Sequence, residues 1–375
     1  MKILFVATVY RHLTAFHIPH MKYFQSLGYE VWAASGDGIY DRRLLEQENV
    51  RCVDISFSRS LKSRDNLKAI KQMKQLLKEE RFDFVDVHTP IASFITRFVA
   101  RNLRHTRVVY TAHGFHFFKG APLINWLLYY TAEKIATPWT SHLITINEED
   151  FHNAKKLGYS SKKVSYVHGV GVDVVNQDIS REVEQRLIEE FSIQKQHVVI
   201  SYVAELNDNK NHLFLLQNWG AIKEQAPNAK LLIIGKGSHE DLLKKYVDEH
   251  SLVDITFTGY RRDVDDILKV SQIVTLLSKR EGLPKSVMEA MVNEVPCIVS
   301  DTRGLRDLIT NQINGYVVEL GNDQQLLKAF TELVNTPDKR EQFGKQAKID
   351  IENYLLPNVI LEYQEVYRKL LNEVE

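Results

Sequence analysis

Two glutamates flank a short segment that contains a glycine and a proline, and their spacing suits the binding of a phosphorylated sugar. Glu281 directly precedes Gly282, and seven residues separate it from Glu289. A carboxylate accepts hydrogen bonds from sugar hydroxyls, and free N–H groups at the start of a helix attract phosphate. Residues 281–289 therefore predict a site for a ligand of the sugar-nucleotide type.

The elements expected around this segment are a strand and a helix. Residues 273–277 form a short apolar run typical of a buried strand, and apolar residues recur at helical spacing after Pro284. We expect Pro284 at the first helical position, where its missing N–H has no cost. Gly282 would let a ligand approach the backbone. The segment is thus predicted to be a strand-to-helix turn.

The residues around the two glutamates resemble the donor-site signature of the retaining glycosyltransferases of family 4. Ala290-Met291 follow the second glutamate, and the run Pro296-Cys297-Ile298-Val299-Ser300 comes next. The resemblance covers nearly the whole chain. It implies that Glu281 contacts hydroxyls of the donor sugar and that Glu289 contacts those of the ribose. It also implies phosphate binding at this turn, beside Pro284, by the amides of Gly282, Leu283 and Lys285.

The family also binds the donor through residues outside this turn. Its members place an arginine five residues before a lysine to neutralise the diphosphate, and Lys210 matches the lysine. Glu205 stands at the arginine position, and Glu294 replaces a common glycine, so two positions depart from the pattern. The resemblance further implies that His113 reaches the donor sugar from the first domain.

Five more positions are candidates for binding or for tight turns. Arg261 follows a predicted strand that ends at residue 258, where relatives bind the nucleotide base. Gly235 and Gly237 allow either a structural turn or a ligand contact. His17 and His116 could contact the acceptor, although a helix start explains His17 equally well.

The pattern of strands and helices predicts an α/β fold with two doubly wound parallel sheets. Strand-like runs alternate with helical segments throughout the chain, except for a pause near Gly169 and Gly171. We predict an acceptor-binding domain over residues 1–172 and a nucleotide-sugar-binding domain over 173–355. By resemblance, the helix 356–375 returns to the first domain, and the architecture is GT-B, in which two Rossmann-like domains face a cleft.

Length and composition agree with a globular protein of the cytoplasm. The chain has 375 residues, more than the roughly 250–300 at which a single core stops growing. Cys52 and Cys297 are the only cysteines and lie far apart in the sequence, so neither a disulfide framework nor a zinc site is suggested. No apolar run approaches the roughly 20 residues needed to cross a bilayer.

Basic residues favour contact with an anionic membrane surface. Residues 1–180 contain 24 Lys and Arg against 17 Asp and Glu. Two basic stripes lie on predicted helices, and each could instead be an ordinary solvated face. They are formed by Arg97, Arg101 and Arg104 and by Lys68, Lys71 and Lys74.

The resemblance implies a metal-independent hexosyltransferase with a donor linked to UDP, most plausibly an N-acetylated hexose. The acceptor would be lipid-linked or a glycan, in bacterial capsule or exopolysaccharide synthesis at the inner face of the cell membrane. No nucleic-acid partner is expected. Two alternatives stay open: an isomerase of the UDP-sugar 2-epimerase type on the same scaffold, and a weakly active subunit that assists a partner transferase.

Overall fold

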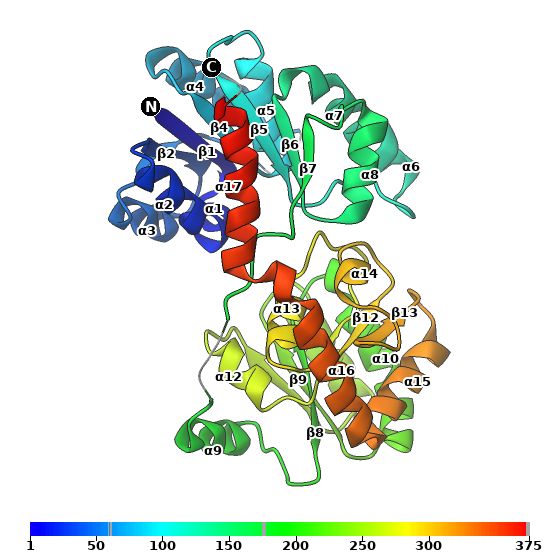
Figure 1. The fold of residues 1–375 in the computed structure, drawn as a ribbon. Helices are drawn as coiled ribbons and strands as arrows, with labels where there is room; N and C mark the ends of the chain where they lie inside the picture. Colours follow the sequence, from blue (N-terminus) through cyan, green and yellow to red (C-terminus); the bar gives the residue numbers. More distant parts are fainter. Residues whose placement is uncertain (59, 61, 175–177, 373–375) are drawn as a thin grey trace. The chain divides into compact units, whose positions relative to one another are not determined.

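A computed structural model describes residues 1–58, 60, 62–174 and 178–372 of the chain. The chain divides by its internal contacts into two compact units, which are Met1–Gly171 with Pro357–Glu375 and Val172–Leu356. This division lies one residue from the predicted boundary. Each unit contains one sheet covered by helices, and all strand pairs within the two sheets are parallel (Figure 1). The predicted α/β fold with two doubly wound sheets is therefore confirmed.

Unit 1 contains a seven-stranded sheet in the order β3-β2-β1-β4-β5-β6-β7. Its strands are β1 (Lys2–Val9), β2 (Glu30–Gly36), β3 (Arg51–Asp54), β4 (Phe84–Val87), β5 (Arg107–Ala112), β6 (His142–Thr145) and β7 (Val164–Tyr166). Its helices are α1 (Tyr10–Phe16), α2 (Ile18–Ser26), α3 (Ile39–Gln47), α4 (Asp65–Glu79), α5 (Pro90–Ala100), α6 (Leu123–Asn125), the π-helix η1 (Trp126–Tyr130), α7 (Thr131–Ala136), the 3₁₀ helix η2 (Thr137–Trp139), α8 (Glu148–Leu157) and α17 (Leu356–Asn372).

Unit 2 contains a six-stranded sheet in the order β10-β9-β8-β11-β12-β13. Its strands are β8 (Val198–Val203), β9 (Ala229–Ile234), β10 (Ile255–Gly259), β11 (Ile273–Leu276), β12 (Cys297–Ser300) and β13 (Gly315–Val318). Its helices are α9 (Arg181–Glu190), the 3₁₀ helix η3 (Asp208–Lys210), α10 (His212–Gln225), α11 (Glu240–Glu249), α12 (Val264–Lys269), α13 (Lys285–Val292), α14 (Leu305–Leu308), α15 (Asp323–Asn335), α16 (Pro337–Asp350) and the 3₁₀ helix η4 (Glu352–Tyr354).

Alternate residues of β1 show why both faces of the first sheet are covered. Leu4 and Val6 pack in one apolar cluster, whereas Ile3 and Phe5 pack in a second cluster on the opposite face. Side chains of successive strand residues point to opposite faces, so a strand that is apolar at every position needs cover on both. Tyr363 and other residues of α17 belong to the second cluster, which places this helix on unit 1 (Figure 1).

The strand order places two loops side by side at the centre of each sheet. In unit 1 the order reverses between β1 and β4, and in unit 2 it reverses between β8 and β11. The loops that follow such a pair of strands diverge and leave a crevice beyond the carboxyl ends, where open α/β sheets bind their ligands. The segments after these four strands are therefore the first places to look for a site.

The basic stripe predicted on residues 97–104 is wrong, because Arg97 is buried. Its guanidinium lies 2.9 and 3.0 Å from the two carboxylate oxygens of Glu133 and 4.2 Å from the ring centroid of Tyr110. Neither charge faces solvent. Arg97 therefore connects α5 to α7 within unit 1 and cannot bind lipid head groups.

We expect Glu133→Ala to destabilise unit 1, because it leaves the guanidinium of Arg97 buried without a counter-charge. The loss in the free energy of unfolding should be about 3–5 kcal/mol, measured by urea denaturation. Glu365→Ala is the matched control, since Glu365 pairs with Lys369 on the exposed surface of α17. Equal midpoints for the two variants would contradict the structural role of the buried pair.

No described helix combines the length and the apolar character required to span a bilayer.

Candidate active site

Two loops meet at the centre of the sheet of unit 2, and hydrogen bonds join them. One follows β8 and contains η3, and the other follows β11 and leads into α13. The side-chain amides of Asn209 and Asn211 donate to the carbonyls of Arg280 and Leu277 at 3.0 and 3.1 Å. The hydroxyl of Tyr202 donates to the carbonyl of Lys210 and accepts from the amide of Leu277. These bonds fix the two loops relative to each other.

The joined loops bring Lys210 and Glu281 together, although the sequence separates them by 71 residues. The Nζ atom of Lys210 lies 2.5 Å from Oε1 of Glu281, and both side chains are largely shielded from solvent. A partly buried pair is screened less than a surface pair. The sequence analysis assigned these two residues to one donor site, and the structure places their charged groups in direct contact.

The start of α13 lies beside this pair and presents free backbone donors. Pro284 occupies the N-cap with φ −78° and ψ 120°, so the helix begins at Lys285, one residue later than predicted. Within the described chain, the N–H groups of Gly282, Leu283 and Lys285 have no hydrogen-bond acceptor. Unsatisfied N–H groups at a helix start attract anions. The predicted phosphate donors are therefore available.

Gly304 and Arg303, which the sequence analysis did not single out, hold the loop before α13. A Cβ atom on Gly304 would lie 2.0 Å from the carbonyl oxygen of Gly282, so only glycine permits this backbone contact. The buried Arg303 donates from Nε to the carbonyl of Glu281 at 3.1 Å. Both residues lie in the loop between β12 and α14. Their place just after a predicted strand was the only sequence signal of a role in supporting the site.

Glu289 lies one turn into α13, and its side chain is partly buried. Burial raises the pKa of its carboxyl, and the Lys285 ammonium, 3.8 Å away, opposes this rise. A half-buried carboxylate with one distant cation keeps acceptor capacity for a ligand hydroxyl. Its position is consistent with the ribose contact that the resemblance implies.

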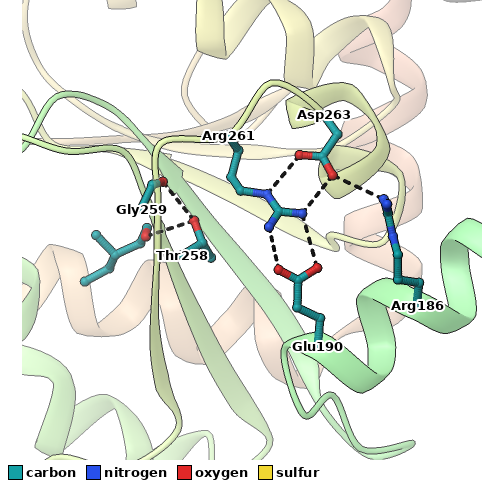
Figure 2. A network of polar contacts seen from close by, with 7 residues as sticks. Arg186, Glu190, Thr258, Gly259, Arg261 and Asp263 are labelled. Atoms are coloured by element: carbon teal, nitrogen blue, oxygen red, sulfur yellow. Dashed lines mark hydrogen bonds and ion pairs between the residues drawn. The ribbon is translucent and has the colours of Figure 1, made fainter.

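The structure gives Arg261 a structural role and argues against the predicted donor contact. Its guanidinium binds the carboxylates of both Glu190 and Asp263, and Asp263 also pairs with Arg186 at 3.2 Å (Figure 2). Four of its N–H groups are used in these bonds, because each carboxylate accepts two. Arg261 thus ties the end of β10 to α9, and little donor capacity is left for a nucleotide base.

Asp263 and Asp265 have the Asp-x-Asp spacing of metal-binding carboxylates, which the sequence analysis overlooked. Arg261 and Arg186 bind Asp263, and Lys269 lies 2.7 Å from Asp265. Because both carboxylates are paired with cations, they are poorly suited to bind a metal ion. Residues 263–265 therefore give no reason to replace the prediction of a metal-independent transferase.

Gly235 and Gly237 serve the packing of the backbone. Cβ atoms at these positions would lie 2.0 and 2.2 Å from the carbonyl oxygens of Ala204 and Leu206. The loop after β9 therefore packs directly on the loop after β8. This close backbone contact explains why glycine occupies both positions.

The two departures from the family pattern have different structural consequences. Glu205 is exposed and places a carboxylate where the family pattern has an arginine. Glu294 has a φ of 57°, the left-handed conformation that glycine adopts most easily. The turn after α13 therefore has a backbone conformation that a glycine would also adopt.

In unit 1, His113 belongs to a group of imidazoles at the carboxyl ends of β1, β4 and β5. Its Nε2 lies 3.3 Å from Nδ1 of His88, and its ring meets that of His12 edge to face at 4.5 Å. Burial lowers the pKa of all three side chains, that of His12 to about 4. His113 is therefore a neutral imidazole near pH 7, which can donate or accept a hydrogen bond.

A pocket of about 570 Å³ lies between the loops that follow β1 and β4. His116 lines it and packs on Tyr129 with ring centroids 4.6 Å apart. His17 does not line it, because its side chain is buried and stacks on His88 at 3.8 Å. The structure therefore gives no support to an acceptor contact of His17 in this pocket. His12, the histidine five residues earlier, lines the pocket instead.

Comparison with known proteins identifies the family. Residues 183–350 match the family model of glycosyl transferases group 1, and residues 2–147 match that of glycosyl transferase 4-like proteins. A Bacillus subtilis protein with the name glycosyltransferase EpsD is 33% identical over 374 residues, covering 98% of this chain and 96% of that protein. The chain belongs to the family 4 glycosyltransferases. It is thus an enzyme of the glycosyltransferase class.

Further similarities support the same assignment. The UDP-Gal:α-D-GlcNAc-diphosphoundecaprenol α-1,3-galactosyltransferase of Escherichia coli is 29% identical over 287 residues, covering 73% of each chain. The crystal structure of Anabaena HepE in complex with UDP and glucose superimposes with a TM-score of 0.80 at 16% identity, covering 99% of this chain and 100% of that one. These similarities confirm the predicted GT-B fold of the glycosyltransferase.

We expect Gly304→Ala to destabilise unit 2 more than alanine at another glycine of positive φ, because the added Cβ would also clash with the loop before α13. Gly304 and Gly321 both have a left-handed φ, of 73° and 77°, but only Gly304 has neighbouring atoms within 4 Å of an added Cβ. Gly321→Ala should cost about 1–2 kcal/mol in the free energy of unfolding, and Gly304→Ala distinctly more. Thermal and urea denaturation measure both, and equal losses would mean that the contact with Gly282 is unimportant.

Proposed function

We propose that this glycosyltransferase moves a sugar from a UDP-linked donor to a lipid-linked or glycan acceptor with retention of anomeric configuration. The proposal rests on one observation above all: Lys210 and Glu281 touch beside the free N–H groups at the start of α13. A cation and backbone donors suit a diphosphate, and the adjacent carboxylate suits sugar hydroxyls. UDP is favoured because HepE was crystallised with UDP and the Escherichia coli relative is named for UDP-Gal.

The residues of unit 2 would act by binding and by stabilising the leaving group. The anomeric carbon loses its bond to the donor phosphate oxygen and gains a bond to the acceptor oxygen. The acceptor proton passes to the departing diphosphate, whose charge Lys210 and the amides of Gly282, Leu283 and Lys285 stabilise. Glu281 holds the sugar hydroxyls and Glu289 the ribose. No step requires a metal ion, and we propose metal-independent transfer.

Two histidines of unit 1 are proposed to serve the sugar and the acceptor. His113 contacts the donor sugar as a neutral imidazole, in accordance with its lowered pKa. His116 contacts the acceptor, because it lines the pocket beyond β1 and β4. We further propose an N-acetylated hexose as the transferred sugar and a role in capsule or exopolysaccharide synthesis at the inner face of the cell membrane.

Glu281→Ala should reduce turnover about 10- to 100-fold, the equivalent of one charge-assisted hydrogen bond, while leaving the thermal unfolding midpoint near that of the parent. The assay incubates a panel of UDP-sugars with a membrane lipid extract and follows product by mass spectrometry. Glu249→Ala, an exposed glutamate of α11, is the matched control. Absence of transfer from every donor by the parent would overturn the proposed function, and normal turnover by Glu281→Ala would remove that residue from the site.

The same assay separates the two alternatives. A 2-epimerase would convert the donor without acceptor, which NMR of the sugar detects. An assisting subunit would need a partner chain, so turnover by the purified chain alone would exclude it.

We also propose that unit 1 contacts an anionic membrane through residues 123–136, which form α6, η1 and α7. Leu123 and Leu127 are 87% and 66% exposed on this segment, and Ile124, Leu128 and Ile135 are also exposed. Trp126, Tyr129 and Tyr130 of the same segment pack against the core of unit 1. An apolar surface on an anchored helix suits the acyl region of a bilayer.

Position and charge favour a membrane as the occupant of this surface. Tyr129 lines the pocket with His116, so a lipid-linked acceptor bound at the segment would be near the proposed acceptor site. The exposed Lys134 of α7 donates to the carbonyl of Lys156, so this lysine lies near the exposed Lys155 and Lys156 at the end of α8. Lysines near a bilayer favour anionic lipids by about 1 kcal/mol each. The predicted stripe of Lys68, Lys71 and Lys74 is exposed on α4 and remains a second candidate.

Replacing Leu123 and Leu127 together by Ser should weaken binding to vesicles that contain phosphatidylglycerol by at least about 10-fold, because two leucines lose their apolar contact with lipid. Cosedimentation measures the bound fraction, and vesicles of phosphatidylcholine alone test the electrostatic part. Leu361→Ser is the control, since Leu361 is 61% exposed on α17. Unchanged binding of the double variant would exclude this segment as the membrane contact.

A further inference from the structure

Four histidines from three segments of the chain converge at the carboxyl ends of the central strands of unit 1. His12 and His17 follow β1, His88 follows β4, and His113 follows β5. One ring nitrogen from each lies within 4.8 Å of the other three. No other described group of three or more histidines, cysteines or carboxylates is arranged in this way. A hydrogen bond of 3.3 Å joins His113 to His88, but it leaves other ring nitrogens of the group without a partner.

Several of these imidazoles are buried with unused nitrogens. His17 and His88 are 1% and 0% exposed, and the Nε2 atoms of His12, His17 and His88 have no hydrogen-bond partner in the described structure. A buried polar atom without a partner costs about 1–3 kcal/mol. A ligand at the centre of the group would remove part of this cost.

The distances fit a tetrahedral ion after a small contraction. Nitrogens bound to Zn²⁺ at about 2.0–2.1 Å lie about 3.3–3.4 Å apart in a tetrahedron. Nε2 of His113 and Nδ1 of His88 already lie 3.3 Å apart. The widest of the other separations is within 4.8 Å, so modest rotations of the rings would complete the site.

Asp86 occupies the position of an outer-shell partner. Its Oδ2 lies 3.6 Å from Nε2 of His88, on the opposite side of the ring from the Nδ1 atom that faces His113. Tyr367 and Thr111 donate to the Asp86 carboxylate and hold it in place. Histidines that bind a metal commonly present their second nitrogen to such a carboxylate. The negative charge would also offset part of the charge of the ion.

His12 lines the 570 Å³ pocket, which gives an ion a path from solvent.

We propose that His12, His17, His88 and His113 form a binding site for a divalent transition-metal ion of the Zn²⁺ class. Imidazole ligands select such ions over Mg²⁺ or Ca²⁺. The ion would take no part in the chemistry of transfer. It would withdraw His113 from the donor sugar and thereby slow transfer. The predicted slowing of transfer rests on the proposed function, whereas the predicted binding of the ion does not.

The test uses the full chain without a polyhistidine tag, stripped with EDTA and titrated with Co²⁺. We expect one Co²⁺ per chain with the intense visible absorption of four-coordinate cobalt, and displacement of that signal by Zn²⁺. The double variant His12→Gln/His113→Gln should bind more than about 100-fold more weakly, and Asp86→Asn about 10- to 100-fold more weakly. Circular dichroism verifies that each variant is folded.

His20→Gln is the matched control, because His20 is buried beside His17 but lies outside the group of four. It should bind Co²⁺ like the parent. Absence of bound Co²⁺, the weak spectrum of a six-coordinate ion, or unchanged affinity of the double variant would each overturn the site. Where transfer is measurable, one equivalent of Zn²⁺ should slow it several-fold and EDTA should restore it. Binding without this effect would overturn the inhibitory role.

Discussion

The reversal of strand order at the centre of each sheet is the constraint on which the proposed sites depend. A parallel sheet whose order reverses leaves a crevice beyond two carboxyl ends, because the connections from those strands cross to opposite faces. In unit 2 the strands are β8 and β11, and their loops contain Lys210 and Glu281. In unit 1 they are β1 and β4, and their loops contain His12 and His88. Topology therefore brings together side chains that are far apart in the chain.

Burial decides which charged and titratable residues are available for ligands. Arg97 and Glu133 neutralise each other inside unit 1, since a buried charge is stable only when it is paired. Arg261 is held by two carboxylates in a similar way. Lys210 and Glu281 also form a pair, but theirs lies beside free amides at a helix start, where a diphosphate could bind to the ammonium. Similar ion pairs thus have structural or functional roles according to their surroundings.

The departures from the family pattern leave most of the donor site in place. Glu205 stands where the family pattern has an arginine, so the proposed phosphate donors are Lys210 and the backbone amides before and at the start of α13. Glu294 keeps the left-handed turn of the glycine that it replaces. The buried guanidinium of Arg303 donates a hydrogen bond to the carbonyl of Glu281 and so stabilises the loop before α13. The proposed donor site thus keeps one cation, Lys210, and a supported loop before α13.

The sequence by itself determined the α/β class, the two domains and the turn at residues 281–289, because periodicity and family motifs are local properties of the chain. It could not determine the ion pairs of Arg97 and Arg261, the burial of His17, or the convergence of His12, His88 and His113. Each of these depends on contacts between segments that only the folded sheets bring together. Burial then fixes the charge of those groups, so the tertiary structure decided which of the predicted residues can meet a ligand.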